Sequence, residues 1–459
     1  MQEIDRLLKN QDSFFKSKKT LSINYRKESL IRLRKSIYSH EEEIIEALYK
    51  DLKKPKLEAY ASEIGVVLTE LNYFIKNIKK LTKPKRVKSA LLNFPSKEYI
   101  YQDPYGRVLI IAPWNYPFQL TINPMIAAIA AGNCVVCKPS EVSTNTSQLV
   151  AKIIAQVFNQ EHVSTIEGGI DITQFLLKQK WEYIFFTGSS SVGKIIMKAA
   201  AEQLCPITLE LGGKSPVIVN KDAKLKQSAK RIAWGKLFNA GQTCIAPDYI
   251  YVHESVKKEF TTLLIAEFKA ALGEDHQQSK DYARIVNNKH YDRIMALLDK
   301  EKVVYGGGHN AKENYIEPTL LNNIDWDSKS MKEEIFGPLL PIMTFTDLNT
   351  IIDTINNQDK PLAAYYFGET KKDQETFLKQ LYFGGGCIND TVIHVAGKSL
   401  PFGGVGTSGI GSYHGAKSFE CFSHQKGIVK RGTWIDVPIR YAPYASKLPF
   451  IKKLFKFIS

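Results

Sequence analysis

The sequence predicts an α/β protein built on doubly wound parallel sheets. Short apolar strands alternate with helical segments between residues 108 and 202, and a second alternating section runs from 211 to 410. Such alternation is typical of parallel sheets with helices on both faces. The chain of 459 residues also exceeds the usual limit of a single hydrophobic core, so we expect two or three domains.

The individual elements follow from the spacing of apolar residues. Residues 1–80 are predicted to be helical, because apolar side chains recur there at helical intervals. A basic, proline-punctuated segment at 82–104 ends in a predicted strand at 97–102. The strands predicted after it cover 108–112, 134–137 and 183–187, and the helices cover 119–131, 143–158 and 192–202. Beyond residue 429 the sequence predicts irregular structure before a short amphipathic end.

Composition and charge exclude several classes of protein. The 62 basic and 47 acidic residues give a net charge of +15, but no nucleic-acid motif accompanies them, so a solvated basic surface is favoured over nucleic-acid binding. Six cysteines in a chain of this length indicate reduced thiols and a cytoplasmic protein. Cys134 and Cys137 form a CxxC inside an apolar strand, so no metal site is predicted. No secretion signal is predicted, and no apolar run reaches the roughly 18 residues that span a bilayer.

Cys244 is the strongest candidate for chemistry. It lies in the run Gly241-Gln242-Thr243-Cys244, which predicts a nucleophile on an exposed turn, although a free cysteine is commonly a small buried hydrophobe. Upstream, Glu210 ends an apolar strand that breaks on paired glycines. A thiol and an isolated carboxylate are the components of covalent catalysis followed by water activation.

Three further segments follow predicted strands. Gly188, Ser189 and Gly193 lie between a strand and a helix, where small residues let a phosphate approach backbone N–H groups. This segment also contains the GxxxxGK of a P-loop, but Ile195 lacks the hydroxyl that a P-loop places on magnesium, and a plain tight turn is equally compatible. Asn115 follows another strand, where its amide could stabilise an oxyanion or simply form a turn.

Lys138 and Glu141 close the next strand. They suit the recognition of ribose hydroxyls, while helix capping and surface charge are the plainer alternatives. Downstream, Glu334 and Phe336 combine an acid, an aromatic ring and a turn, and the glycine-rich run 401–409 predicts an ordered loop. His394 and His414 have no spacing that implies a metal site or a catalytic triad, so both are interpreted as structural.

Taken together, these runs resemble the aldehyde dehydrogenase superfamily, and within it the class 3 branch of fatty and aromatic aldehyde dehydrogenases. The resemblance extends in order from about residue 20 to 432. The motifs that carry it are Pro113-Trp114-Asn115-Tyr116-Pro117, Lys138-Pro139-Ser140-Glu141, Leu209-Glu210-Leu211-Gly212-Gly213-Lys214, Gly241-Gln242-Thr243-Cys244, Glu334-Ile335-Phe336-Gly337-Pro338 and Pro401-Phe402-Gly403-Gly404-Val405. A short N-terminal region and the run Gly411-Ser412-Tyr413-His414-Gly415 indicate class 3.

The resemblance implies roles for these residues. Cys244 would attack the aldehyde, Asn115 would stabilise the oxyanion, and Glu210 would activate the water that hydrolyses a thioester. Tyr116 and Phe402 would line the substrate pocket. The cofactor would be NAD, with NADP as an accepted alternative, and its contacts would be Trp114, Lys138, Glu141, Gly188, Ser189, Gly193, Leu211, Gly212, Glu334 and Phe336.

The resemblance also implies the domain plan and a homodimer. The NAD-binding domain would cover 1–82 and 104–210, the catalytic domain 211–418, and the dimerisation arm 83–103 and 419–432, whereas the tail 433–459 departs from the family pattern. In that tail, residues 449–458 place Phe450, Ile451, Leu454, Phe455 and Ile458 on one helical face and lysines on the other. Such a helix suits peripheral membrane contact, and packing across a dimer or over the substrate entrance are the alternatives.

The expected function is NAD(P)-dependent oxidation of medium- or long-chain aliphatic or aromatic aldehydes to carboxylic acids. A non-catalytic scaffold at a membrane surface is the first alternative, and the presence of thiol, carboxylate and amide together disfavours it. A P-loop nucleotide hydrolase is the second, which Ile195 disfavours. A coenzyme-A-acylating enzyme would share the thioester but typically lacks the base, so Glu210 disfavours that one.

Overall fold

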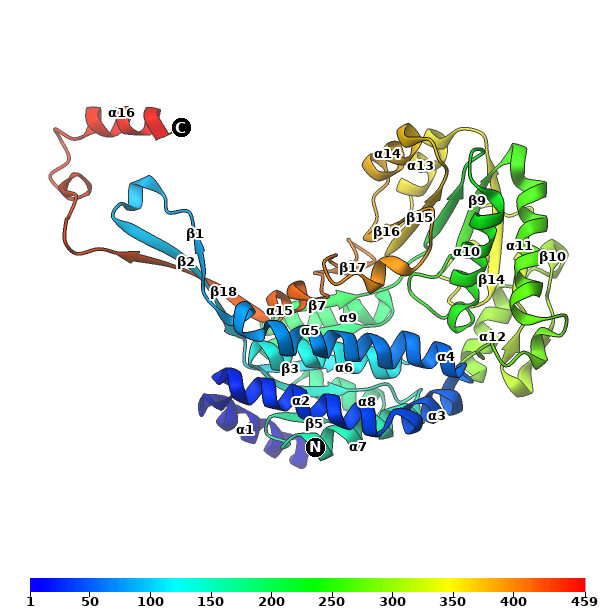
Figure 1. Cartoon of the computed structure of the whole chain (residues 1–459), viewed down its shortest axis with the longest axis horizontal. Coiled ribbons are helices and arrows are strands. Elements are labelled where there is room, and N and C mark those ends of the chain that lie inside the picture. The colour runs from blue at the N-terminus through cyan, green and yellow to red at the C-terminus, as the bar shows by residue number, and fades with distance from the viewer. Residues whose placement is uncertain (459) are drawn as a thin grey trace.

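The first of two large sheets confirms the predicted doubly wound architecture (Figure 1). The computed structural model describes residues 1–458, and the side chain of Ile458 and all of Ser459 lie outside that description. Six strands pair in the order β17-β7-β6-β3-β4-β5, all parallel except β17. They are β3 (Arg107–Ile111), β4 (Cys134–Lys138), β5 (Val163–Thr165), β6 (Tyr183–Thr187), β7 (Ile207–Glu210) and β17 (Gly409–Ile410).

Helices cover both faces of this sheet, because successive strand residues point to opposite sides. Val108 and Ile110 pack with one set of helices, while Leu109 and Ile111 pack with the other. The first set is α2 (Ile23–Ser39), α3 (Glu41–Leu52), α5 (Gly65–Thr82), α6 (Pro117–Ala131) and α7 (Thr144–Val157). The second set is α1 (Gln2–Lys16), α8 (Ile170–Leu177) and α9 (Ser190–Glu202). The helix predicted at 119 starts at Pro117, since proline suits the first helical position.

The second sheet has seven strands in the order β10-β13-β14-β9-β8-β15-β16, with only β10 antiparallel. They are β8 (Pro216–Val219), β9 (Tyr249–His253), β10 (Val303–Tyr305), β13 (Thr319–Leu321), β14 (Leu339–Phe345), β15 (Ala363–Phe367) and β16 (Gly385–Ile388). Its helices are α10 (Leu225–Leu237), α11 (Lys257–Leu272), α12 (Asn288–Leu297), α13 (Leu348–Asn356) and α14 (Lys371–Gln380). A small hairpin joins β11 (His309–Asn310) to β12 (Tyr315–Ile316).

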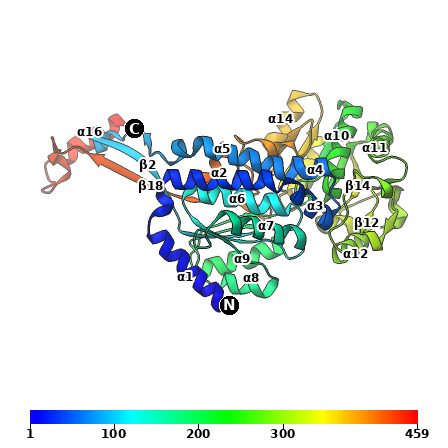
Figure 2. The same ribbon diagram turned by 60° about the horizontal axis from the view of Figure 1, so that its bottom comes forward.

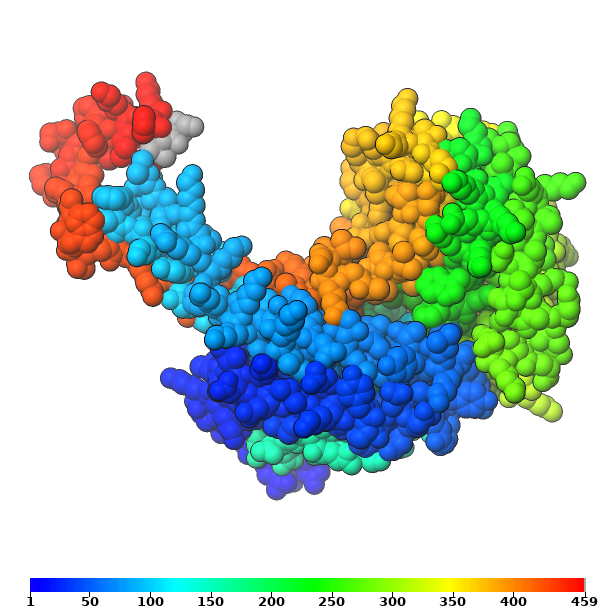
Figure 3. Space-filling model, in the orientation of Figure 1, coloured from blue at the N-terminus to red at the C-terminus, as the bar shows by residue number. Residues whose placement is uncertain are grey.

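A three-stranded antiparallel arm projects from the body, as Figures 1 and 2 both show. It consists of β1 (Lys85–Val87), β2 (Ser96–Pro104) and β18 (Ser423–Arg431), and β18 follows the short helix α15 (Ala416–Cys421). The last helix, α16 (Leu448–Ile458), lies near the far end of the arm. Figure 3 shows an open gap between the arm and the half of the body that holds the second sheet.

A buried ion pair fixes the segment between α3 and α5. The Lys54 Nζ lies 2.5 Å from a Glu63 oxygen, and both side chains are fully buried. The other Glu63 oxygen accepts the backbone N–H groups of Phe118 and Gln119, in the first turn of α6, at 3.0 Å each. Lys54 also donates to the carbonyl of Asn115 at 3.2 Å. One pair therefore holds both the start of α6 and the turn after β3.

We predict that Lys54→Met lowers the free energy of unfolding by about 3–5 kcal/mol, because Glu63 is left buried without its counter-charge. Chemical denaturation followed by circular dichroism measures this loss. The matched control is Lys50→Met, which breaks the exposed pair of Lys50 with Glu46 and should cost less than about 1 kcal/mol. Similar losses in the two variants would contradict the role given to the buried pair.

Candidate active site

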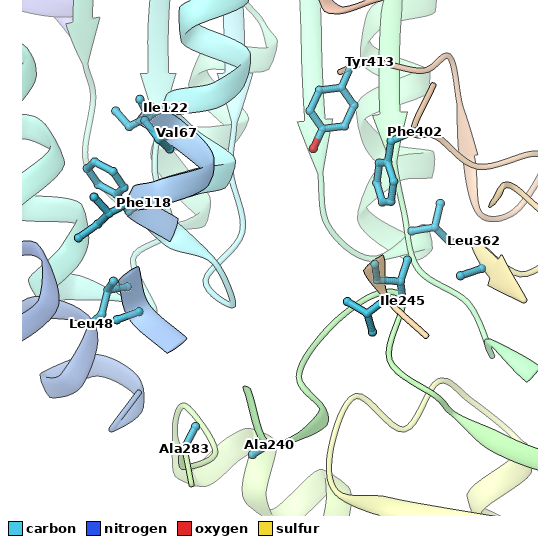
Figure 4. Packing of buried hydrophobic residues seen from close by; sticks show 14 of the residues in the cluster. Leu48, Val67, Phe118, Ile122, Ala240, Ile245, Ala283, Leu362, Phe402 and Tyr413 are labelled. Atoms are coloured by element: carbon cyan, nitrogen blue, oxygen red, sulfur yellow. The ribbon is translucent and has the colours of Figure 1, made fainter. Parts of the chain in front are cut away.

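A cavity of about 770 Å³ lies beside Cys244 and Glu210. Both residues contribute to its wall, together with Tyr116 and Phe402, the two residues expected in the substrate pocket. Most of the other side chains around it are apolar or aromatic, among them Ile245, Leu362 and Tyr413. Figure 4 shows Tyr413, Phe402, Leu362 and Ile245 following one another along one side. Four residues that are far apart in the chain and were predicted to share one site therefore border one cavity: Tyr116, Glu210, Cys244 and Phe402.

The loop before Cys244 has an unusual backbone. Asn239, Ala240 and Gly241 have φ values of 53°, 51° and 74°, in the left-handed region that non-glycine residues rarely adopt. A Cβ on Gly241 would lie 2.3 Å from the carbonyl oxygen of Gly337, so only glycine fits there. The expectation of an exposed turn is wrong, because this loop packs inside the protein and presents Cys244 to the cavity.

Hydrogen bonds hold this loop in place. The Asn239 amide donates to the carbonyl of Asn115 at 2.9 Å and to that of Gln242 at 3.1 Å. The Gln242 side chain donates to the Arg284 carbonyl at 2.9 Å and accepts the N–H of Val286 at 3.0 Å. Each bond pairs a buried polar group that would otherwise cost free energy. Together these bonds keep the backbone of residues 239–241 in its strained conformation.

Asn115 lies directly against this loop. Its side-chain Nδ2 donates to the carbonyl of Gln242 at 3.1 Å, two residues before Cys244, and the side chain is buried. Asn115 is not among the residues that border the cavity itself. Because a primary amide carries two hydrogens, one donor remains after the bond to Gln242. The arrangement can therefore place a second donor near the thiol.

Glu210 ends β7, and its carboxylate is buried. Neither carboxylate oxygen has a hydrogen-bond partner among residues 1–457, whose side chains the structure describes, and burial raises the pKa of Glu210 well above its usual range. Burial also raises the pKa of the Cys244 thiol, with smaller contributions from the carboxyl groups of Glu334 and Glu210. A carboxylate in so apolar a place is a strong base once it is ionised.

The predicted cofactor residues meet at one edge of the first sheet. Lys138 ends β4, Trp114 follows β3, Gly188 follows β6 and Leu211 follows β7, and these four strands are parallel neighbours. Ligands of doubly wound sheets bind at the carboxyl ends of the strands. The Lys138 Nζ lies 2.5 Å from a Glu141 oxygen. Burial acts to raise the pKa of Glu141, but the hydrogen bond from Lys138, a backbone hydrogen bond and the charge of Lys138 together lower the pKa.

Three glycines allow close approach at this edge. A Cβ on Gly193 would lie 2.7 Å from the side chain of Leu211, so glycine lets α9 pack against the segment after β7. A Cβ on Gly188 would lie 2.4 Å from the ring of Phe186. The Ser189 hydroxyl accepts the Val192 N–H at the N-terminus of α9, where the helix dipole favours a negative group.

Glu334 occupies the space left by the third glycine. Its Oε2 lies 2.1 Å from the position that a Cβ on Gly212 would take. Burial and the neighbouring Asp248 raise the pKa of Glu334 to about 8. The Trp114 ring meets Phe336 edge to face at 5.3 Å and His290 at 4.6 Å between ring centroids. His290 had no signal in the sequence, because only the fold brings it to Trp114.

These features fit the dinucleotide that the resemblance implies. Carboxylates at Glu141 and Glu334 suit ribose hydroxyls, and the N-terminus of α9, which Ser189 caps, suits a phosphate. The structure thus brings the predicted cofactor residues to one sheet edge and places Leu211 on the cavity wall as well. His394 and His414, interpreted as structural, each stack on the ring of Phe402, at centroid distances of 6.0 and 5.1 Å.

Comparison with known proteins identifies the family. The model of the aldehyde dehydrogenase family matches residues 1–428. The chain is 48% identical to 4,4'-diaponeurosporen-aldehyde dehydrogenase of Staphylococcus aureus, over 99% of this chain and 100% of that protein. It is 43% identical to the dimeric NADP-preferring aldehyde dehydrogenase of Canis lupus familiaris, over 98% of this chain and 99% of that protein.

A solved structure agrees with these relatives. The substrate-bound state of Staphylococcus aureus AldH superposes with a TM-score of 0.97 at 48% identity, covering 98% of this chain and 99% of that one. Neither the scaffold nor the P-loop alternative receives support from any of these matches. The aldehyde dehydrogenase family 3 member A2 of Mus musculus is 42% identical over 91% of this chain and 86% of that protein. The chain therefore belongs to the aldehyde dehydrogenase family, within its class 3 branch, and is an NAD(P)-dependent aldehyde dehydrogenase.

Proposed function

We propose that this enzyme oxidises medium- and long-chain aliphatic or aromatic aldehydes to carboxylic acids, with Cys244 as nucleophile and Glu210 as base. The observation that carries the proposal is that both residues border the same cavity of about 770 Å³. Its wall of leucine, isoleucine, alanine and aromatic side chains favours apolar substrates, since burying apolar surface is worth about 25 cal/mol per Å². The Staphylococcus aureus relative is named 4,4'-diaponeurosporen-aldehyde dehydrogenase, and an apolar substrate of that kind is consistent with an apolar cavity.

In the proposed mechanism the Cys244 thiolate attacks the aldehyde carbon and forms a thiohemiacetal. The backbone N–H of Cys244 and the second amide hydrogen of Asn115 stabilise the developing oxyanion. A bound NAD(P) supplies the two-electron oxidation that turns the thiohemiacetal into a thioester on Cys244. Glu210 then takes a proton from water, which attacks the thioester and releases the acid. Because burial makes Glu210 a stronger base, the apolar cavity assists this last step.

We infer the residues that would hold the cofactor from their chemistry. Lys138 and Glu141 would bind the adenosine ribose, and the turn from Gly188 through Ser189 to Gly193 would face the pyrophosphate. The nicotinamide riboside would contact a cluster formed by Trp114, Leu211, Gly212, Glu334 and Phe336. These residues belong to the proposed NAD-binding domain, 1–82 and 104–210, and to the start and middle of the proposed catalytic domain, 211–418.

The acid at Glu141 favours NAD over NADP. An acid beside the ribose accepts a hydrogen bond from the 2′-hydroxyl and repels a 2′-phosphate. The Glu141 carboxylate is already paired with Lys138, however, so part of its charge is compensated. That pairing agrees with use of both cofactors, and the canine relative is named as preferring NADP.

We predict that the enzyme reduces NAD with hexanal, decanal, hexadecanal and benzaldehyde, and that two substitutions separate the steps. Cys244→Ser should lose turnover, because no thioester can form. Glu210→Gln should keep a first burst of NADH and lose steady-state turnover by about 10²–10⁴-fold, because deacylation lacks its base. Absorbance at the NADH band in stopped-flow and steady-state assays measures both.

The control for these substitutions is Glu375→Gln, which neutralises an exposed carboxylate on α14 and should leave both phases unchanged. Normal steady-state turnover in Glu210→Gln would refute the role of Glu210. A folded wild-type enzyme without turnover on any of the four aldehydes would refute the proposed substrate class.

We further propose a cytoplasmic homodimer in which the arm covers a second copy. The arm segments 83–103 and 419–432 include β1, β2 and β18, which have little contact with the rest of their own chain. The canine relative is named as dimeric, which is consistent with this arrangement. All six cysteines are free thiols, as a reducing compartment favours.

The tail 433–459 carries the proposed peripheral membrane contact. No helix within residues 1–458 is long and apolar enough to cross a bilayer. On α16, Phe450 and Phe455 are exposed, and Phe457, outside the predicted face, is 83% exposed. Trp434 and Phe94 meet edge to face at the far part of the arm, and both are exposed. Exposed aromatic rings beside lysines are the composition of an interfacial helix.

We predict that vesicles of phosphatidylcholine and phosphatidylglycerol sediment the full-length protein and not a protein truncated after residue 446. The physical reason is that the truncation removes all of α16, with its apolar rings and its lysines. The bound fraction is measured by ultracentrifugation, and size-exclusion chromatography with light scattering confirms that both proteins keep the same oligomeric state. Equal sedimentation of the two proteins would eliminate the membrane role.

A further inference from the structure

We propose that Glu58 is a positioning residue that holds the Cys244 loop in its strained conformation. The proposal rests on the proposed role of Cys244 as the nucleophile. Glu58 lies on the one-turn helix α4 (Lys56–Ala59) and borders the same cavity as Cys244 and Glu210. None of the sequence motifs includes it, and the mechanism above does not use it.

The first argument is a direct hydrogen bond to the loop. A Glu58 carboxylate oxygen accepts the backbone N–H of Asn239 at 2.8 Å. Asn239 is the first of the three consecutive left-handed residues, and its side chain is fully buried. A bond to a charged acceptor is roughly twice as strong as a neutral one. Glu58 therefore anchors the backbone at the point where the strained turn begins.

The second argument is the connection from this anchor to the thiol. The Asn239 side chain bridges the carbonyls of Asn115 and Gln242, and Asn115 donates to the same Gln242 carbonyl. Gln242 is two residues from Cys244. A shift of Asn239 would therefore displace both the proposed oxyanion donor and the nucleophile, and small displacements of reacting groups reduce rates strongly.

The third argument is that the Glu58 segment is itself rigidly held. Lys54 and Glu63 flank Glu58 in the chain and form the fully buried ion pair. Between them the backbone runs through α4 into the π-helical turn η2 (Tyr60–Ile64), a feature often found at functional sites. Glu58 thus acts from a fixed support and not from a mobile loop.

The charges around Glu58 give the positioning a pH dependence. Burial raises the pKa of Glu58 to about 7, with Lys54 opposing this shift and Glu63 adding to it. Below that pH the neutral acid is a weaker acceptor, and above it the carboxylate holds Asn239 more firmly. The other titratable groups that face Glu58 or share its cavity are Tyr116, Tyr282, Glu210, Lys230, Cys244, Glu267, Asp281 and Tyr413.

The experiment measures alkylation of Cys244 by iodoacetamide without cofactor, from pH 6 to 8.5, by mass spectrometry of the peptide that contains Cys244. Glu58→Ala removes the acceptor, and we expect the rate to fall by about tenfold or more. Glu58→Gln keeps an oxygen acceptor without charge. Its rate should match wild type at pH 6 and fall about threefold below wild type at pH 8. The wild-type to Gln ratio isolates Glu58, because the other groups are common to both proteins.

The matched control is Asp347→Asn, a carboxylate that also accepts a backbone N–H at 2.8 Å but caps the N-terminus of α13 and does not border the cavity. It should alkylate like wild type at every pH. The NADH burst should fall in parallel with alkylation in the Glu58 variants, while circular dichroism confirms that they are folded.

Wild-type rates in Glu58→Ala, faster alkylation in that variant, or a Gln variant as slow as Ala would each overturn the proposal. So would a wild-type to Gln ratio that does not change with pH. Failure of the proposed function is a separate result, since it would appear as aldehyde oxidation that survives Cys244→Ser.

Discussion

The site depends on one buried hydrogen-bonded junction between the two sheets, centred on Asn115. Its carbonyl accepts from Lys54 and Asn239, and its amide donates to the carbonyl of Gln242. The turn after β3 in the first sheet is thereby tied to the loop that precedes β9 in the second. Because buried polar groups are costly when unpaired, no part of this junction can move alone. The geometry of Cys244 is a consequence of how the sheets are joined.

The three ionisable groups at the centre of the site are held in a buried environment. Cys244, Glu210 and Glu334 all have raised pKa values, and burial is the largest cause for each. The carboxyl groups of Glu334 and Glu210 also disfavour the Cys244 thiolate, since a low dielectric strengthens the repulsion between anions. The resting site therefore favours neutral groups. Any step that creates negative charge needs donors that are already in place, and the fixed backbone provides them.

The sequence predicted the sheet edge well and the loop packing poorly. Lys138, Gly188 and Glu210 could be placed together from sequence, because parallel strands carry their carboxyl ends to one edge whatever their exact register. Glu58, Asn239 and His290 gave no signal, since their partners are distant in the chain. The burial of residues 239–243 was not predicted for the same reason, although the Cys244 side chain itself is half-buried. Small polar residues indicate a turn, but only the packing of a second sheet decides whether that turn faces solvent.

The strands of the arm are poorly covered by the rest of their own chain. Every residue of β2 is at least partly exposed, and most of β18 is exposed. Three strands need an apolar face against a core or a partner to be stable in water. On β2 and β18, Tyr99 and Tyr101 instead carry the ammonium groups of Lys426 and Lys430 over their rings, a solvated arrangement. The body of the same chain thus leaves the edges and faces of the arm uncovered. In the proposed homodimer, a second copy of the chain would cover them.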